Sequence, residues 1–127
     1  MSVDEHPMHF TSESFTPTLD APRHVRELLR SQLRELHCDE DLIELGTLTA
    51  SELAANAVLH AHTPFRLLID RTDESVWIAV EDEQPVKDRF NVVTRPLHGL
   101  ALIAALALRW GVTPRTHGKV VWAELPR

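Results

Sequence analysis

A long helical pattern between residues 39 and 61 constrains this chain more than any other feature of its sequence. Asp39 is a candidate N-cap, and leucines at helical spacing lead into an alanine-rich series that continues to about Ala61. Within residues 50–61 the only polar side chains are Ser51, Glu52, Asn56 and His60. A helix that is apolar around most of its circumference is expected to be packed inside a fold, with its narrow polar stripe lining a cleft.

The polar stripe of this helix has a geometry that suits chemistry. At about 100° per residue, Glu52, Asn56 and His60 lie within roughly 80° of one another, so the three side chains face one place. Ordinary solvent exposure of an amphipathic helix gives the same pattern, and this alternative stays open. If the stripe lines a cleft, an amide oxygen can ligate Mg²⁺ and a glutamate can orient or deprotonate a hydroxyl group, as a nucleotide site requires.

The rest of the chain divides into segments of helical and of strand-like pattern. We expect an edge strand at residues 9–15, followed by helices at 21–37 and 39–61 and by a hairpin of two strands at 65–70 and 76–82. A long loop at 83–98, a third helix at 99–111 and a last strand at 119–125 complete the chain. Gly99 opens the third helix and Gly111 closes it. The pattern predicts one α+β domain over residues 1–127, a two-layer sandwich with helices on one face of a mostly antiparallel sheet.

Charge and composition exclude several classes of partner. The net charge is −6 and no dense Lys/Arg stripe is present, so we expect no direct binding to nucleic acid. No apolar run approaches the roughly 20 residues of a membrane helix, so we expect no membrane partner. The N-terminus has no long apolar core of a secretory signal, and we expect residues 1–8 to be disordered. The single Cys38 cannot form an internal disulfide, which favours the cytoplasm.

Two positions outside the long helix could complete a nucleotide site. Asp82 ends the expected third strand, where a carboxylate can accept a hydrogen bond from an exocyclic amine such as adenine N6. Gly99 stands at the N-terminus of the apolar third helix, where free backbone amides and the helix dipole favour phosphate. The loop between them, residues 83–98, would then close over the nucleotide as a lid. Each position alone is a weak signal, and their order along the chain strengthens them together.

Four stretches of sequence carry a resemblance to a known family. They are TASELAANAVLHA, VEDEQP, HGLALIAALALRWGV and GKVVWAEL. In this order they resemble the small ATP-binding domain of anti-sigma factor serine/threonine kinases, members of the GHKL (Bergerat-fold) ATPase superfamily, and the similarity is greatest to the short versions found in actinobacteria. The resemblance extends from the first helix to the C-terminus. It implies a Bergerat-type sandwich that binds ATP and Mg²⁺.

The resemblance also implies roles for individual residues. Glu52 corresponds to the general base, Asn56 to the Mg²⁺ ligand and Asp82 to the carboxylate that recognises adenine. The second glycine motif, which contacts the phosphates, falls on His98, Gly99 and Leu100, and Gly118 lies in the segment that borders the adenine pocket. His60 occupies a place from which it can approach the phosphates. A hydrogen-bonded histidine at a helix end is an equally good interpretation of His60.

The sequence departs from the family pattern at three places. Where the first glycine motif has D-x-G, Asp82 is followed by Glu83 and Gln84, without the glycine. The second motif has Leu97 in place of its first glycine. Near the last strand, Val120 stands where a hydroxyl residue is usual, and we interpret this as a hydrogen bond lost beside Asp82, worth roughly 0.5–1.5 kcal/mol. These departures predict weakened or absent ATP binding.

Two functions therefore remain open. The first is a Mg-ATP-dependent serine/threonine kinase that phosphorylates an anti-anti-sigma (STAS-domain) partner and also binds a sigma factor, with Glu52 as the base. The second is a degenerate, non-catalytic module of the same fold that sequesters a sigma factor or an anti-anti-sigma factor without using ATP. Glu52 and Asn56 favour the kinase, whereas Gln84, Leu97 and Val120 favour the module. Because family kinases of this kind commonly pair, a homodimer is compatible with both.

Two further classes are disfavoured. The chain has eight histidines, but His60 and His62 cannot both point to one site from a regular helix, so we do not expect a structural metal. A sensor histidine kinase is disfavoured because no pair of dimerisation helices precedes the domain to supply a phosphorylated histidine.

Overall fold

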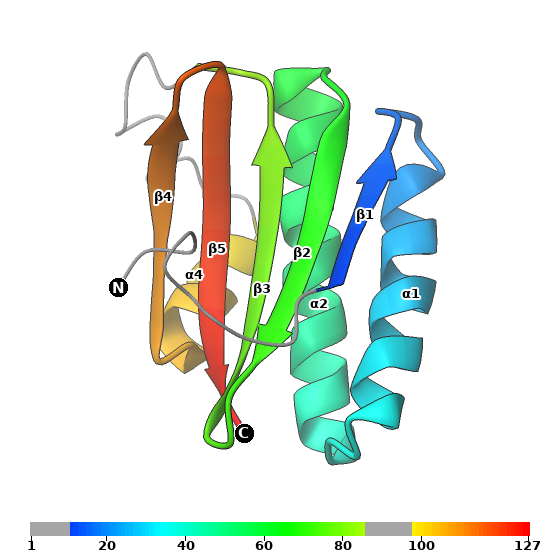
Figure 1. Cartoon of the computed structure of the whole chain (residues 1–127), viewed down its shortest axis with the longest axis vertical. Helices are drawn as coiled ribbons and strands as arrows, with labels where there is room; N and C mark the ends of the chain where they lie inside the picture. Colours follow the sequence, from blue (N-terminus) through cyan, green and yellow to red (C-terminus); the bar gives the residue numbers. More distant parts are fainter. Residues whose placement is uncertain (1–10, 86–97) are drawn as a thin grey trace.

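The computed structural model describes residues 11–85 and 98–127. The described elements are β1 (Thr11–Phe15), α1 (Ala21–Glu35), α2 (Glu40–Asn56), η2 (Ala57–Ala61), β2 (Phe65–Arg71), β3 (Ser75–Asp82), α4 (His98–Leu106), β4 (Arg109–Arg115) and β5 (Gly118–Pro126). Figure 1 shows them along the chain. The segment predicted to be disordered, residues 1–8, lies outside the described residues, as does most of the predicted lid.

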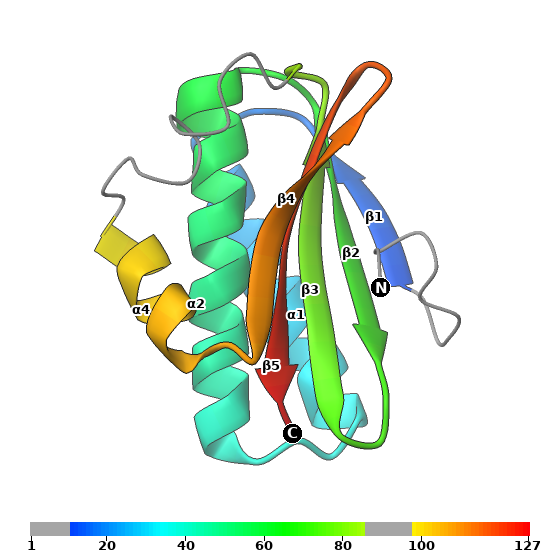
Figure 2. The same ribbon diagram turned by 90° about the vertical axis from the view of Figure 1, so that its left-hand side faces the viewer.

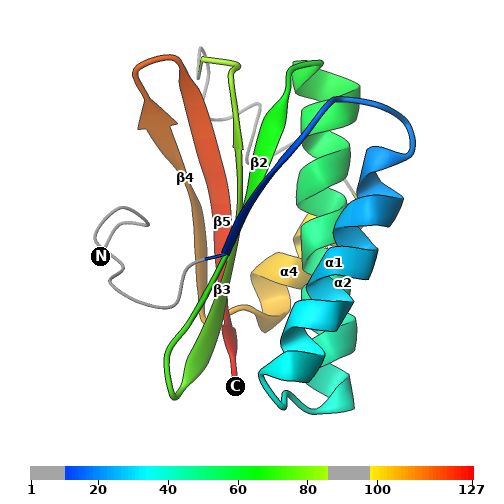
Figure 3. The same cartoon turned by 45° about the vertical axis from the view of Figure 1, so that its right-hand side comes forward.

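The five strands form one sheet in the order β1-β2-β3-β5-β4, and every neighbouring pair is antiparallel. Helices α1, α2 and α4 cover one face of this sheet, so the described chain forms two layers (Figures 2 and 3). The predicted α+β sandwich is confirmed, and so is the N-terminal edge strand. The predicted hairpin of β2 and β3 is confirmed as well, with paired partners from Phe65–Asp82 to Arg71–Val76.

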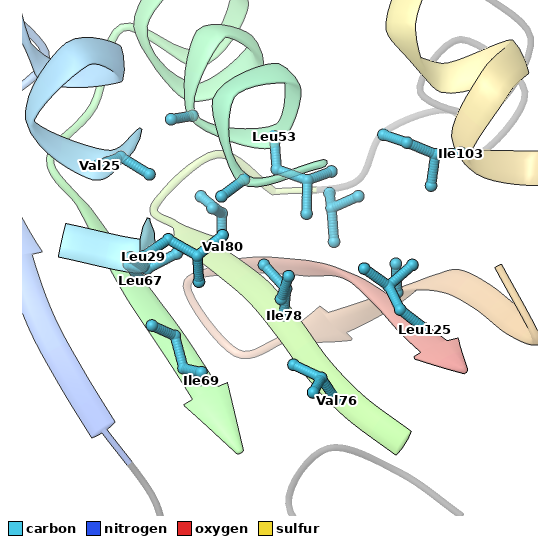
Figure 4. Close-up of a cluster of buried hydrophobic side chains, with 14 of the residues drawn as sticks. Val25, Leu29, Leu53, Leu67, Ile69, Val76, Ile78, Val80, Ile103 and Leu125 are labelled. Atoms are coloured by element: carbon cyan, nitrogen blue, oxygen red, sulfur yellow. The ribbon is translucent and has the colours of Figure 1, made fainter. Parts of the chain in front are cut away.

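The core lies between the sheet and the helices. Helix α1 buries one residue per turn, and helix α2 buries residues on two adjoining faces, because α2 packs on both α1 and the sheet. The strands contribute every second residue, as the alternation of a half-covered sheet requires. Figure 4 shows this cluster, including Val25, Leu29, Leu53, Leu67, Ile69, Val76, Ile78, Val80, Ile103 and Leu125.

A smaller apolar cluster occupies the opposite face of the sheet. Leu68, Ala79 and Val120 are buried there, with Trp122 packed against them. The ring of Trp77 stacks on Trp122 with centroids 5.2 Å apart. This cluster belongs to the sheet face that α1, α2 and α4 do not cover, so the parity of a strand residue decides which of the two clusters it joins.

The long predicted helix is present and changes type near its end. Asp39 caps α2 through a 2.8 Å hydrogen bond from the Leu42 amide to Oδ1, which confirms the predicted N-cap. The helix then continues from α2 into η2, a π-helix. Together they run 22 residues and are long and apolar enough for a membrane span, contrary to the expectation that no segment approaches that length. However, 56% of the window is buried inside the fold, as in the core helix of a soluble protein.

The predicted helix over residues 99–111 is wrong in its second half. Helix α4 ends at Leu106, and Gly111, predicted to close it, lies in strand β4. Gly111 is a typical residue after a helix C-terminus, so the local pattern does not reveal whether residues 107–111 belong to the helix or to a strand. Pairing with β5 decides it, and Pro114 is tolerated because β4 is an edge strand.

Candidate nucleotide-binding site

Helix α2 brings two of the predicted site residues to one place. Glu52 and Asn56 are one helical turn apart, and both side chains are half-buried. The α-helical hydrogen bonding ends at Asn56, and the π-helix η2 begins at the next residue. His62 closes the π turn in the left-handed region at φ 56°, with its amide donating to the Ala57 carbonyl at 2.8 Å. Turns of π-helix inside longer helices are frequent at functional sites.

The side chain of Asn56 has an unusual hydrogen-bonding state. Its Oδ1 is buried and has no hydrogen-bond partner among the described residues. Buried polar atoms are nearly always satisfied by protein, water or ligand, and an unsatisfied one costs about 1–3 kcal/mol. An orphan amide oxygen beside a half-buried carboxylate is the donor set that a hard cation prefers. The local structure therefore fits the Mg²⁺ role that the resemblance implies for Asn56.

His60 does not continue the stripe in the predicted way. It lies in η2, not in the α-helix, and its side chain is exposed. Glu52 and Asn56 thus form the predicted α-helical row, and the expectation that His60 faces the same place stays a prediction. The change of helix type follows Asn56 immediately, which periodicity in the sequence does not reveal.

Asp82 ends strand β3 and points to the same layer as the helices. Its neighbours at every second position, such as Val80, belong to the helix-side core, so Asp82 lies on that face of the sheet. The residue is 5% exposed. Figure 1 shows the end of β3, the start of β5 and the η2 end of the long helix at the same end of the molecule. The predicted carboxylate is therefore placed at the end of the sheet beside which η2 lies.

The carboxylate of Asp82 is already engaged by the chain itself. Its Oδ2 accepts a 2.7 Å hydrogen bond from Lys119 Nζ, and its Oδ1 accepts a 2.9 Å bond from the Gln84 amide. Lys119 Nζ also donates to Gln84 Oε1 at 3.2 Å. The ion pair is almost inaccessible, with side-chain exposures of 6% for Lys119 and 3% for Asp82. The three residues form a closed polar network at the position predicted for adenine.

Sequence reasoning missed Lys119 as a site residue. Lys119 lies directly opposite Asp82 in the pairing of β3 with β5, so both side chains are on one face. The signal was present in the predicted last strand, but it needed the register between two strands 37 residues apart in the sequence. Without that register, the lysine is an ordinary residue at the start of a strand.

The interpretation of Val120 as a lost hydroxyl beside Asp82 is wrong. Val120 pairs with Glu81 and is fully buried in the cluster on the opposite face of the sheet. Its side chain therefore packs with Leu68 and Ala79, away from the Asp82 carboxylate. The chemistry beside Asp82 is determined by Lys119, one position earlier.

Gly118 has a clear structural reason to be glycine. A Cβ at this position would overlap the backbone carbonyl of Asp82 and would also lie 3.0 Å from the Glu83 Cα. The glycine lets β5 begin directly against the end of β3, which sets Lys119 opposite Asp82. The predicted contact of Gly118 with a nucleotide stays a prediction.

The phosphate end of the predicted site is described only in part. His98, Gly99 and Leu100 form the first turn of α4, which packs beside α2 (Figure 2). Their side chains lie outside what the structure describes, as does Leu97. Of the predicted lid, residues 83–85 are described and exposed. The helix start predicted for the second glycine motif is confirmed, and its contacts with phosphates stay a prediction.

A hollow at the same end of the sheet includes Asp82 and Gly118 and extends over further residues. It is lined mainly by β2, the end of β3 and the β4–β5 turn, and includes Arg66, Glu81 and Arg115. Glu81 pairs with Arg66 at 2.7 Å and with Arg115 at 3.5 Å. These three side chains lie on the face away from the helices, because their strand parity is opposite to that of Asp82. The hollow therefore opens mainly on that face, and the site residues Asp82 and Gly118 also line it.

Metal ligands of other kinds do not gather in the described part of the chain. No group of three or more His, Cys, Asp or Glu side chains there is placed to hold an ion. Cys38 is a free thiol, and burial raises its pKa, so it is a neutral group at pH 7.

Comparisons with known proteins agree with this fold. Residues 15–125 match the family described as the histidine kinase-like ATPase domain. The fold is similar to the crystal structure of the RsbU and RsbW domains of Rv1364c from Mycobacterium tuberculosis, with a TM-score of 0.72 and 23% identity. The match covers 95% of this chain and 34% of that one, so this chain spans about a third of that protein's length. The search of curated proteins gave no significant match. Because the family match extends over most of its length, the chain belongs to the histidine kinase-like ATPase domains.

Proposed function

We propose that this protein is an ATP-binding regulator that transfers phosphate from Mg-ATP to a serine or threonine of an anti-anti-sigma (STAS-domain) partner, and that it also binds a sigma factor. Membership of the histidine kinase-like ATPase domains supports nucleotide binding. The similarity of the fold to a structure that contains an RsbW domain supports the regulatory role. The observation that carries the proposal is the buried Oδ1 of Asn56, which has no partner among the described residues and lies one turn from Glu52.

Each described residue has a definite task in this proposal. Asn56 supplies an oxygen ligand to Mg²⁺, which neutralises charge on the phosphates when it is bound. Glu52 accepts the proton of the partner's hydroxyl, one helical turn from the metal ligand. The amides at the start of α4, at His98, Gly99 and Leu100, bind phosphate oxygens. His60 lies in η2, from which it approaches the phosphates.

The two halves of the site fit their ligands differently. The metal half fits, because an orphan amide oxygen and a half-buried carboxylate are present and adjacent. The half that would bind adenine fits only if Asp82 becomes accessible, because Lys119 Nζ and the backbone amide of Gln84 already donate to its two oxygens. Gly118 contributes by allowing the close approach of β5 to β3 at this point. Residues 83–98 would close over the nucleotide and exclude water.

Nucleotide binding is tested first by calorimetric titration of Mg-ATP into the purified protein and into Asn56→Ala. We expect saturable binding that requires Mg²⁺ in the wild type and a loss of about tenfold or more in Asn56→Ala. Ser51→Ala is the matched control on the same helix, because its hydroxyl contacts Arg26 at 3.0 Å and not the stripe. No saturable binding at millimolar ATP would exclude the kinase.

Phosphotransfer is tested with γ-labelled ATP and candidate STAS-domain proteins, with the product identified by mass spectrometry. We expect the label on a serine or threonine of the partner, and none on a variant of the partner that lacks that hydroxyl. Binding of ATP without transfer to any such partner would leave a nucleotide-dependent binding protein in place of a kinase.

A second function is favoured by one specific observation. The occupied carboxylate of Asp82 suits a module that no longer uses ATP and sequesters a sigma factor or an anti-anti-sigma factor in the cytoplasm. Such a module would form the same complex, by size-exclusion chromatography, with and without Mg-ATP. A complex that forms or dissociates only with Mg-ATP supports the kinase instead, and the same elution profiles show whether the protein is a homodimer.

A further inference from the structure

The ammonium of Lys119 lies against the carboxylate of Asp82, the group to which the resemblance assigns adenine recognition. Lys119 Nζ is 2.7 Å from Asp82 Oδ2, and the two side chains are 6% and 3% exposed. The same ammonium donates to Gln84 Oε1 at 3.2 Å, and the backbone amide of Gln84 donates to Asp82 Oδ1 at 2.9 Å. Each carboxylate oxygen therefore accepts a hydrogen bond from the chain itself, and the side chain is almost inaccessible.

An exocyclic amine would seek the same acceptor that Lys119 uses. An amino group on a base donates N–H to a carboxylate oxygen at about 2.7–3.2 Å, the range that the ammonium already occupies. The ammonium has the advantage of a full charge, because charge-assisted hydrogen bonds are roughly twice as strong as neutral ones. A neutral amine of the nucleobase at the same place therefore competes with a stronger donor.

The ion pair does not follow from the sheet alone. At the preceding position on β3, on the opposite face, Glu81 pairs with Arg66 at 2.7 Å with side-chain exposures of 27% and 46%. That pair is of the ordinary surface kind, which contributes little to stability. The Asp82–Lys119 pair is instead buried, and burial of two charges is compensated only by close geometry and further hydrogen bonds, which Gln84 supplies.

We propose that the Lys119 ammonium competes with adenine for the Asp82 carboxylate. Lys119 would thus determine affinity and specificity, because it occupies this acceptor until a nucleotide displaces it. The inference rests on the proposed nucleotide site and goes beyond it, because it assigns the weakness of base recognition to one side chain. One departure from the family pattern contributes: Gln84, where the family has glycine, accepts a hydrogen bond from the Lys119 ammonium and holds it in place.

The competition has a specific signature in the chemistry of the base. Adenine carries an amino group at position 6, whereas inosine carries a carbonyl oxygen there. Removal of the Lys119 ammonium should therefore strengthen ATP binding and leave inosine triphosphate unimproved. A nonspecific effect of charge would act in the opposite direction, because loss of a cation weakens binding of any triphosphate.

The test measures dissociation constants of Mg-ATP and Mg-inosine triphosphate for the wild type, Lys119→Met, Lys119→Arg and Arg66→Met. We expect Lys119→Met to bind ATP about ten- to hundredfold more tightly, the equivalent of one hydrogen bond to a charged group, with inosine triphosphate unchanged or weaker. Lys119→Arg keeps a cation at the carboxylate and should show no gain. Arg66→Met removes the exposed pair on the opposite face and should behave as the wild type.

A second variant keeps the test decisive if Lys119→Met does not fold, since it leaves a buried carboxylate unpaired. Gln84→Ala removes the exposed side chain that holds the ammonium and leaves the ion pair, so it should fold and bind ATP several-fold more tightly. Equal ATP affinity in the wild type, Lys119→Met and Gln84→Ala would overturn the inference while the proposed nucleotide site stands. Absence of nucleotide binding in all variants would overturn both.

Discussion

The two ends of the candidate site differ in how their polar groups are satisfied. At the end of helix α2, the Asn56 oxygen has no partner among the described residues, and Glu52 is half-buried beside it. At the end of strand β3, both oxygens of Asp82 are bound by Lys119 and Gln84. Both places are buried, yet one leaves an acceptor open and the other closes it with a residue of the chain.

This difference separates groups retained for a ligand from groups retained for the fold. A closed, buried ion pair adds to folding only when all of its members are present, whereas an orphan acceptor costs stability and is explained by a ligand. Loss of the Asp82 carboxylate should therefore be felt mainly in stability, because it leaves the Lys119 ammonium unpaired, and substitutions at the Asn56 end mainly in binding and transfer. The predictions below test that division.

The largest effect is expected at Glu52. Glu52→Gln removes the general base but keeps the size and shape of the side chain. Phosphotransfer to the partner should therefore fall about 10²- to 10⁴-fold while Mg-ATP affinity is unchanged. Initial rates with labelled ATP measure this, with Ser51→Ala as the neighbouring control. Transfer at the wild-type rate in Glu52→Gln would remove Glu52 from the role of base.

The next largest effect is expected at Asp82. Asp82→Ala leaves the Lys119 ammonium buried without its partner, so the free energy of unfolding should fall by about 3–5 kcal/mol. Urea denaturation followed by tryptophan fluorescence measures it. The double variant Asp82→Ala with Lys119→Met should recover part of this loss, because no uncompensated charge remains. Losses that simply add in the double variant would show that the pair is not coupled in solution.

A smaller effect is expected at Gly118. Gly118→Ala places a Cβ against the Asp82 carbonyl, and relieving the overlap should cost about 1–3 kcal/mol in the free energy of unfolding. Gly111→Ala is the matched control in β4, because its Cβ would meet only the Trp122 ring, at 3.1 Å. Equal urea midpoints for the two alanine variants would argue against the close approach of β5 to the end of β3.

The smallest effect on stability is expected at Asn56. Asn56→Ala removes an unsatisfied acceptor and introduces a better helix former, so unfolding should change by no more than about 0.5 kcal/mol. Thermal unfolding with and without Mg-ATP checks it, and only the nucleotide-induced stabilisation should be lost. A fall of several kcal/mol without nucleotide would make Asn56 a structural residue.

Much of the fold follows from local patterns. Helix α1 and strand β2 carry clear periods of 3.6 and 2, α2 is a long apolar stretch with a recognisable cap at Asp39, and β3 is a short apolar run. Strand β4 could not be assigned in this way, because Gly111 and Pro114 within Arg109–Arg115 are typical of a helix end and a turn. Its identity depends on pairing with β5, a contact between segments and not a property of one.

The site was predictable to the same limit. Glu52 and Asn56 are related by one helical turn and could be read together from the sequence. The partner of Asp82 could not, because Lys119 becomes its neighbour only through the register of β3 with β5. The change from α-helix to π-helix after Asn56 likewise depends on the packed structure, so the place of His60 was outside what periodicity can show.

In this account, the Asn56 end of the site is open to Mg²⁺ and the Asp82 end is closed to adenine. The most direct test compares the binding of two ligands to the wild-type protein. Mg-tripolyphosphate offers the phosphates and metal of Mg-ATP without the base. If Lys119 holds Asp82, calorimetric titration should give dissociation constants for the two ligands within about tenfold of each other, because the base adds little. Binding of Mg-ATP that is a thousandfold tighter, with no competition from Mg-tripolyphosphate, would contradict this account.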